Sequence, residues 1–170
     1  MNKGLVHLYW GDGKGKTTAA FGLALRMLGS GGTVTVVQFL KDGQSSELEP
    51  LRCLGAAVYS GQAGTGFFSQ MTPEERRTVR ARHNALLTQA LETPCDLLVL
   101  DEACAACRLG MVDEDLLRRA VLERPEGQEV VLTGRDPAEW MQQAADYSTE
   151  MRCHKHPYQQ GITARKGVEY

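Results

Sequence analysis

The stretch that decides the fold runs from residue 5 to residue 28 and reads LVHLYW-GDGKGKTT-AAFGLALRML. Leu5 to Trp10 is a short, largely apolar run, which predicts a buried strand. Thr17 to Leu28 repeats apolar residues at helical spacing, which predicts a helix. Between them lies a glycine-rich loop that ends in Lys16-Thr17. A strand, a loop of this kind and a helix, in this order, are the context that a phosphate-binding loop requires.

The loop residues have the chemistry that binding of a triphosphate needs. Glycines allow backbone N–H groups to converge on phosphate oxygens, and the start of the helix adds its positive dipole end. Lys16 is expected to reach the terminal phosphates, and Thr17 to place its hydroxyl on Mg²⁺. The residues predicted to bind the nucleotide, ATP with Mg²⁺, are Gly11, Asp12, Gly13, Lys14, Gly15, Lys16, Thr17 and Thr18.

The loop departs from the usual pattern G-x-x-x-x-G-K-[ST] at one position. The first glycine of that pattern falls on Trp10, and Gly11 stands one place later. We therefore expect a variant loop whose local path differs. The alternative is a glycine-rich turn that holds no ligand.

Strand and helix patterns alternate along the rest of the chain. Further strands are predicted at 33–40, 57–59, 96–100, 129–133 and 150–153, and further helices at 45–54, 72–91, 113–122 and 137–145. This alternation predicts an α/β fold with a mostly parallel sheet and helices on both faces, the three-layer RecA-like architecture of P-loop NTPases. Residues 1–170 are predicted to form a single domain. We expect its polar tail, from about 155 to 170, to contribute to the site.

Asp101-Glu102 closes the apolar strand pattern at 96–100. A carboxylate there would lie beside the loop, at the carboxyl edge of the sheet where ligands bind. It could hold Mg²⁺ directly or through water. An acidic pair after a strand is by itself more often a solvated turn.

Composition and charge exclude some classes of function. The net charge is −2 and the isoelectric point is near 6.1, whereas a general polyanion binder is basic, so nucleic acid is not expected as a partner. No apolar run is long enough to span a membrane, and no signal peptide is evident. The odd count of five cysteines favours free thiols in a reducing compartment. We therefore expect a cytoplasmic protein.

Two smaller patterns offer weaker candidates for further sites. Cys104 and Cys107 have C-x-x-C spacing, which favours structural thiols over a zinc or redox site because no clear second ligand pair is present. Four arginines at 76, 77, 80 and 82 indicate a solvated helix face. His83, on the same predicted helix, has no evident partner in the sequence.

Several segments, taken in order, resemble one family. The segments are G-D-G-K-G-K-T-T-A-A at 11–20, F-G at 21–22 with Arg26, V-V-Q-F at 36–39 with Lys41, T-G-F at 65–67, V-L-D-E at 99–102, R-P at 124–125, T-G-R at 133–135, K-H-P at 155–157 and G-I-T-A-R-K-G-V-E-Y at 161–170. Over nearly the whole chain they resemble the P-loop class of ATP:corrinoid adenosyltransferases, which act on cob(I)alamin or cob(I)yrinic acid a,c-diamide.

The resemblance implies transfer of the 5′-deoxyadenosyl group of ATP to the Co(I) centre of a corrinoid, with release of triphosphate. It assigns Lys16 to phosphate, and Thr17 and Glu102 to Mg²⁺. Arg135 is implied as a catalytic contact to phosphate or ribose, and Arg26 as a weaker nucleotide contact. Phe67 matches a family aromatic that displaces the lower axial ligand of cobalt. Loop packing is the alternative for Phe67, and a surface position for each arginine.

Two departures from the family pattern bear on these roles. The second aromatic of the family loop, a tryptophan, aligns with Ser69, and the adjacent Phe68 is a candidate replacement. Asp12 stands where the family commonly has asparagine, so its carboxylate must turn away from the phosphates. The resemblance further implies a homodimer and a reduced flavoprotein as electron donor.

Two other functions remain open from the sequence. One is a P-loop ATPase or kinase that acts on another small molecule, with Glu102 orienting water or Asp101 acting as base. The other is an ATP-gated corrinoid carrier without turnover. The product identifies the function, because only the transferase releases triphosphate.

Overall fold

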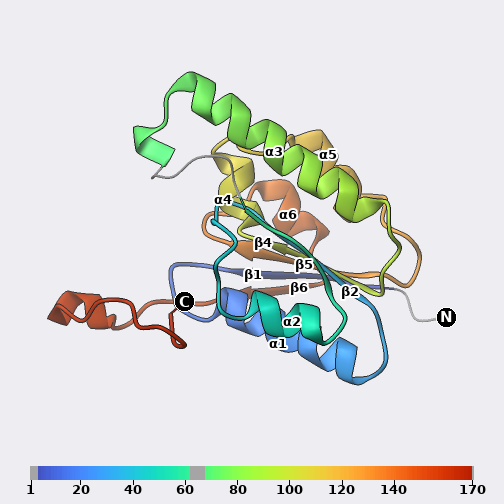
Figure 1. Ribbon diagram of the computed structural model, residues 1–170, viewed down its shortest axis with the longest axis horizontal. Helices are drawn as coiled ribbons and strands as arrows, with labels where there is room; N and C mark the ends of the chain where they lie inside the picture. Colours follow the sequence, from blue (N-terminus) through green and yellow to red (C-terminus); the bar gives the residue numbers. More distant parts are fainter. Residues whose placement is uncertain (1–3, 62–67, 170) are drawn as a thin grey trace.

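The computed structural model describes residues 4–61 and 68–169 of the chain. Its sheet has the strand order β3-β2-β4-β5-β1-β6, and every neighbouring pair is parallel (Figure 1). The strands are β1 (Val6–Trp10), β2 (Val34–Gln38), β3 (Ala57–Tyr59), β4 (Leu97–Asp101), β5 (Glu129–Gly134) and β6 (Tyr147–Glu150). The predicted α/β class and parallel sheet are thereby confirmed.

Helices cover both faces of this sheet. They are α1 (Lys16–Gly29), α2 (Leu48–Cys53), α3 (Pro73–Leu91), α4 (Ala103–Arg108), α5 (Glu114–Leu122) and α6 (Glu139–Ala144), with 3₁₀ turns at Phe68–Gln70 and Pro157–Gln160. Figure 1 shows α1 and α2 on one face and the other four helices on the opposite face. This is the three-layer arrangement that the alternating pattern predicted.

Each face of the sheet has its own apolar core. Under α1 and α2, the side chains of Phe21, Ala24 and Leu48 pack on strand residues such as Val36 and Val99. On the other face, side chains of α3, α5 and α6 pack on β4 and β5. The central strands are buried on both faces, as expected for a parallel sheet covered by helices on each side.

Because all strands are parallel, their carboxyl ends meet at one edge of the sheet. β1 ends at Trp10 and β4 ends at Asp101, with the end of β5 at Gly134 between them. Gly134 adopts φ +143°, and a Cβ there would lie 2.8 Å from the Cβ of Cys104. This close approach lets the start of α4 pack against the end of β5.

The predicted start of α3 is confirmed in detail. The Thr72 side chain accepts a hydrogen bond from the Glu75 backbone N–H, and the Glu75 carboxylate accepts one from the Thr72 N–H. Pro73 occupies the first turn, where a missing N–H costs nothing. This capping box fixes where the helix begins.

Three predicted boundaries were wrong. The last strand was predicted at 150–153 but is β6, at Tyr147–Glu150, because Met151 leaves the sheet to bond with the phosphate loop. The helix predicted at 45–54 begins only at Leu48, since residues 42–47 form a loop. The helix predicted at 137–145 is the shorter α6. α4 was not predicted, because its six residues are too few for a helical pattern to stand out.

His83 has partners that the sequence did not reveal. It is fully buried on α3, where its Nδ1 lies 2.8 Å from the Met111 carbonyl oxygen and its Nε2 accepts a hydrogen bond of 3.2 Å from the Leu40 N–H. Nδ1 therefore carries the proton. The ring joins α3 to the segment that follows β2.

The sequence also favoured free thiols and contained no apolar run long enough to span a membrane. All five cysteines are free, and burial raises the pKa of the Cys104 thiol to about 12. Within residues 4–61 and 68–169, His, Cys, Asp and Glu side chains form no group of three that could hold a metal ion. Over the same ranges, no helix has the length and apolar character needed to cross a membrane.

Candidate functional site

The phosphate loop connects β1 to α1 in a path that only glycine adopts easily. Gly11 has φ +113° and Gly15 has φ +117°, in the region that side chains with a Cβ avoid. Gly13 is closely approached as well, since a Cβ there would lie 2.8 Å from the Met151 backbone. Its N–H donates a hydrogen bond of 2.7 Å to the Met151 carbonyl. The end of β6 therefore supports the loop from one side.

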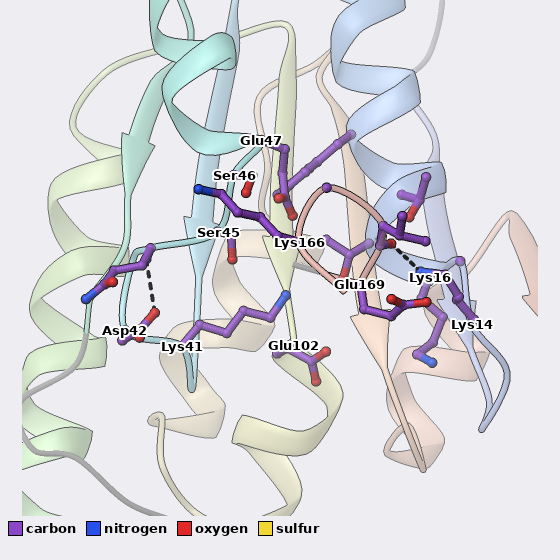
Figure 2. A pocket seen from close by; sticks show the side chains of 17 residues that line it. Lys14, Lys16, Lys41, Asp42, Ser45, Ser46, Glu47, Glu102, Lys166 and Glu169 are labelled. Atoms are coloured by element: carbon purple, nitrogen blue, oxygen red, sulfur yellow. Dashed lines mark hydrogen bonds between the residues drawn. The ribbon is translucent and has the colours of Figure 1, made fainter. Parts of the chain in front are cut away.

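Lys16 is the first residue of α1 and lies half-buried at the mouth of a cavity (Figure 2). Its Nζ donates a hydrogen bond of 2.7 Å to the Gly13 carbonyl, within the same loop. Burial lowers the pKa of Lys16, while the nearby carboxylate of Glu102 opposes that shift. The ammonium group is thus held where an incoming anion can reach it.

Asp101, at the end of β4, is fully buried and accepts four hydrogen bonds. Its Oδ1 accepts from the hydroxyls of Thr17 and Thr133, each at 2.7 Å. Its Oδ2 accepts from Gln38 at 3.1 Å and from the Lys41 ammonium at 2.9 Å. This carboxylate therefore joins the phosphate loop to the ends of β2 and β5.

Glu102 follows directly and has φ +60°, a left-handed conformation that is unusual for a residue with a side chain. Its backbone N–H donates to the Thr133 hydroxyl at 3.0 Å, which helps to hold this turn. The side chain lines the same cavity as Lys16 and Thr17. Burial raises the pKa of Glu102, and the adjacent Asp101 charge adds to the shift.

The cavity itself has a volume of about 1100 Å³ and is lined by three parts of the chain. One is the phosphate loop with the start of α1, one is the segment 41–47 with Glu102, and one is the tail segment 166–169. Figure 2 shows Lys14, Lys16, Lys41 and Lys166 around it. Four carboxylates, those of Asp42, Glu47, Glu102 and Glu169, line the cavity as well. Lys14 and Lys16 lie together at the phosphate loop and the start of α1, and this is the part of the cavity that suits a small polyanion.

A hydrogen bond joins the tail to the phosphate loop. Lys14 Nζ donates a hydrogen bond of 2.7 Å to the Val168 carbonyl. The turn that presents this carbonyl is closed by Arg165 and Glu169, whose side chains pair at 3.0 Å. This pairing lowers the pKa of Glu169 to about 2. Residues near the end of the chain thus form a wall of the cavity.

A second cavity of about 550 Å³ lies on the other side of the loop. Trp10, Asp12 and Arg135 line it together with the end of β6 and the residues after it. The Asp12 carboxylate accepts a hydrogen bond of 2.9 Å from the Cys153 N–H, which lowers the pKa of Asp12. Asp12 is therefore directed toward Cys153 and does not line the cavity that holds Lys16.

The structure brings together most, but not all, of the predicted site residues. Lys14, Gly15, Lys16, Thr17, Thr18 and Glu102 line the larger cavity. Arg135 is exposed and lines the smaller one. Arg26 is exposed on α1, ten residues beyond Lys16 and so roughly 15 Å further along the helix, and it lines neither cavity. Phe67 lies outside the described residues.

Sequence reasoning missed the polar partners of Asp101. Gln38 and Thr133 are at the ends of β2 and β5, and Lys41 follows β2 by three residues. A polar residue at the carboxyl end of a buried strand is the signal that could have found two of them. Lys41 carried no such signal, because its place depends on the turn at Leu40.

Sequence comparison shows which known proteins this chain is similar to. The family described as ATP:corrinoid adenosyltransferase BtuR/CobO/CobP matches residues 2–170. A corrinoid adenosyltransferase of Pseudomonas aeruginosa is 37% identical over 171 residues, which cover 99% of this chain and 84% of that protein. The corrinoid adenosyltransferase of Escherichia coli K12 is 32% identical, and corrinoid adenosyltransferase CobA of Salmonella typhimurium is 33% identical; each alignment covers 99% of this chain and 86% of the relative.

Proposed function

This chain belongs to the ATP:corrinoid adenosyltransferase family BtuR/CobO/CobP, and we propose that its phosphate loop binds the triphosphate of the ATP that supplies the adenosyl group. The protein is an enzyme of cobalamin synthesis that transfers the 5′-deoxyadenosyl group of ATP to the Co(I) centre of a corrinoid and releases triphosphate. The proposal concerns which residues perform this reaction.

The reaction determines what the protein must supply. The reduced cobalt of the substrate donates an electron pair to C5′ of the ribose, so a Co–C bond forms and cobalt becomes Co(III). The bond from C5′ to the triphosphate oxygen breaks, and triphosphate leaves with those bonding electrons. Because Co(I) is already a strong nucleophile, no general base is needed. The protein must hold C5′ against cobalt and stabilise the negative charge of the leaving group.

The single observation that carries the proposal is the larger cavity beside the phosphate loop. Lys16, the N-terminal end of α1 and the loop N–H groups meet there at the carboxyl edge of the sheet. These groups are positive and prearranged, so they stabilise a departing polyphosphate. We assign Lys16 to the terminal phosphates. Arg135, on the other side of the loop, is assigned to a phosphate or the ribose.

The residues present also fit a magnesium ion. The Thr17 hydroxyl donates its proton in a hydrogen bond to Asp101, which leaves the lone pairs of the oxygen available to a cation. The Glu102 carboxylate lines the cavity and accepts no hydrogen bond from residues 4–61 or 68–169. Mg²⁺ is usually held by one or two protein ligands together with substrate phosphates and water. When bound, it would neutralise charge on the triphosphate.

The tail supplies part of the proposed site. Lys166 lines the cavity, and Lys14 donates a hydrogen bond to the Val168 carbonyl. Entry of a triphosphate would offer Lys14 a stronger, charged partner than that carbonyl. We propose that the tail, from about 155 to 170, contributes to the nucleotide site as part of a single domain.

Four further roles complete the proposal. Phe67 displaces the lower ligand of cobalt, which makes Co(II) easier to reduce. A reduced flavoprotein supplies the electrons, the enzyme acts as a homodimer, and it resides in the cytoplasm. The last is supported by five free thiols, which persist in a reducing compartment.

Calorimetry tests the assignment of the nucleotide site. Lys16→Ala should weaken ATP binding by at least about tenfold, since a hydrogen-bonded charge pair is lost. Arg52→Ala is the control, because Arg52 is exposed on α2 and lines neither cavity. Equal ATP affinity of the wild type and Lys16→Ala would refute the assignment.

A further inference from the structure

We propose that Lys41 is a positioning residue of the magnesium site: it pairs with buried Asp101 and holds in place the carboxylate that orients the Thr17 hydroxyl, and buried His83 fixes the turn that carries Lys41. The inference rests on the proposed role of Thr17 as a metal ligand. It concerns what holds that ligand in place.

Asp101 is the residue through which Lys41 acts on Thr17. The side chain has no exposed surface and accepts hydrogen bonds from four donors. Thr17, Thr133 and Gln38 are neutral, and Lys41 is the one cation among the four. A carboxylate removed from water is stabilised by hydrogen bonds and by a nearby positive charge. The 2.9 Å contact from Lys41 Nζ to Oδ2 therefore holds the Asp101 carboxylate in the orientation in which Oδ1 accepts from Thr17.

The orientation of Thr17 follows from this pairing. A hydroxyl has one proton and two lone pairs. With the proton directed to Asp101 at 2.7 Å, only lone pairs are presented to the cavity. A displaced Asp101 carboxylate would release the hydroxyl to rotate. Lys41 thus acts on the proposed metal ligand through one intermediate residue.

Lys41 reaches Asp101 only because the chain turns sharply after β2. Leu40 has φ +59°, a conformation that leucine rarely adopts. The turn is held at both residues that precede Lys41. The Phe39 N–H donates to the Asp101 carbonyl at 3.0 Å, and the Leu40 N–H donates to His83 Nε2 at 3.2 Å.

His83 is well placed to hold this turn. Its Nδ1 is bonded to the Met111 carbonyl, which fixes the tautomer so that Nε2 is the acceptor. The Phe39 ring packs edge-on against the imidazole, with centroids 5.4 Å apart. Burial lowers the pKa of His83, which keeps the ring neutral and Nε2 free to accept. The imidazole is thus fixed by its place on α3 and by its hydrogen bond to Met111, which follows α4.

A competing role for Lys41 is direct contact with the triphosphate. Lys41 lines the cavity, and its side chain is 29% exposed, so a phosphate could reach it. The two roles differ in their dependence on Asp101 and on Mg²⁺. A residue that acts through Asp101 loses its effect when Asp101 has no charge, and it matters only when the metal is bound.

A double-mutant cycle separates the two roles. ATP affinity is measured by calorimetry, with Mg²⁺ and with EDTA, for the wild type, Lys41→Met, Asp101→Asn and the double variant. We expect Lys41→Met alone to weaken Mg²⁺-dependent ATP binding by about tenfold or more, since it leaves a buried charge unpaired. In the Asp101→Asn background it should cost less than about threefold. In EDTA, affinity should stay within about twofold. Lys41→Arg keeps the positive charge, so its Mg²⁺-dependent ATP affinity should be much closer to that of the wild type than the affinity of Lys41→Met.

An equal loss from Lys41→Met in both backgrounds, or a loss that persists in EDTA, would overturn the proposal. Thermal unfolding of each variant identifies any that fail to fold. If Lys41→Met is one of them, Lys41→Arg is compared with the wild type in both backgrounds in its place. If ATP binding by the wild type were itself independent of Mg²⁺, the metal assignment would fail first, and the inference with it. The two failures are therefore distinguishable.

The contribution of His83 is tested by a matched pair of variants. His83→Gln can place an amide oxygen where Nε2 accepts from Leu40, whereas His83→Asn reaches only toward Met111. Both remove the same buried ring, so both should lower the unfolding temperature. We expect only His83→Asn to weaken Mg²⁺-dependent ATP binding, by several-fold. Equal ATP affinity of the two variants would overturn the role of His83.

Discussion

The Thr17 hydroxyl donates a hydrogen bond of 2.7 Å to the Asp101 carboxylate, although the two residues are 84 positions apart in the sequence. Thr17 lies in the first turn of α1, and Asp101 ends β4. The strand β5 separates β1 from β4 in the sheet, and its Thr133 bonds to the same carboxylate oxygen. This contact therefore ties the phosphate loop to the acidic strand end across an intervening strand, and it sets the direction of the Thr17 lone pairs.

Glu102 is predicted to be required for the effect of Mg²⁺. Glu102→Gln keeps the size of the side chain but removes its charge, so it should weaken the apparent Mg²⁺ affinity roughly tenfold or more. The measurement is adenosyl transfer as a function of Mg²⁺ concentration. Glu49→Gln, an exposed carboxylate on α2 outside both cavities, serves as control. An unchanged Mg²⁺ requirement in Glu102→Gln would remove Glu102 from the metal site.

Arg135 is predicted to contribute binding energy for ATP from the second cavity. A charged hydrogen bond contributes about 1.5–3 kcal/mol, so Arg135→Ala should lower kcat/KM for ATP by about tenfold to a hundredfold. Arg135→Lys should fall between, because lysine keeps the charge but not the planar donor geometry. Steady-state kinetics with varied ATP measure the effect. Kinetics of Arg135→Ala that match the wild type would show that this arginine is only a surface residue.

The two glycines Gly134 and Gly22 should respond to alanine in opposite directions. At Gly134 a Cβ would lie 2.8 Å from the Cys104 Cβ in a left-handed backbone, so Gly134→Ala should destabilise the fold by about 2 kcal/mol or more. At Gly22, within α1, a Cβ would meet nothing within 4 Å. Gly22→Ala should stabilise the fold by about 0.5–1 kcal/mol. Urea unfolding measures both, and equal signs would contradict the described packing.

His83 gives a prediction for stability against pH. Burial lowers its folded pKa below the ordinary value of 6.5, so between these two values the unfolded chain binds more protons than the folded chain. The contribution of neutral His83 to the free energy of unfolding is therefore complete above pH 6.5 and decreases as the pH falls below it. The decrease is at most about 1.4 kcal/mol per pH unit.

The comparison uses urea unfolding of the wild type and His83→Gln at about pH 7.5 and about pH 5.5. The wild type should lose more stability between the two values than the variant, because the variant has no group there that titrates. Carboxylates contribute equally to both proteins. Identical losses would show that His83 is not held neutral in the folded state.

Much of the fold could be predicted because its signals are local. The run at Leu5–Trp10, the capping residues before Pro73 and the glycine-rich loop each depend on neighbouring residues alone. β6 was predicted at the wrong position because its four residues are all exposed, and an exposed strand shows no apolar pattern in the sequence. α4 was missed because a six-residue helix offers less than two turns of pattern.

The grouping of Lys16, Thr17 and Glu102 around one cavity could be predicted from local patterns. The loop motif contains Lys16 and Thr17, and Glu102 follows a strand that ends at the same edge of the sheet. Lys41 did not follow, since its position depends on the unusual backbone of Leu40 and on a histidine more than forty residues away. Contacts of this kind arise from packing between elements, which a single sequence does not display.

The most direct test of the whole account follows Co(I) and triphosphate together. Purified protein is mixed with ATP, Mg²⁺ and chemically reduced cobalamin, and the loss of Co(I) absorbance is compared with the amount of triphosphate released. Equal amounts of both are expected with the wild type and neither with Lys16→Ala, while Arg52→Ala should behave as the wild type. Release of phosphate that does not depend on the corrinoid would contradict the transferase assignment and indicate an ATPase. Binding of both substrates without turnover would indicate a carrier.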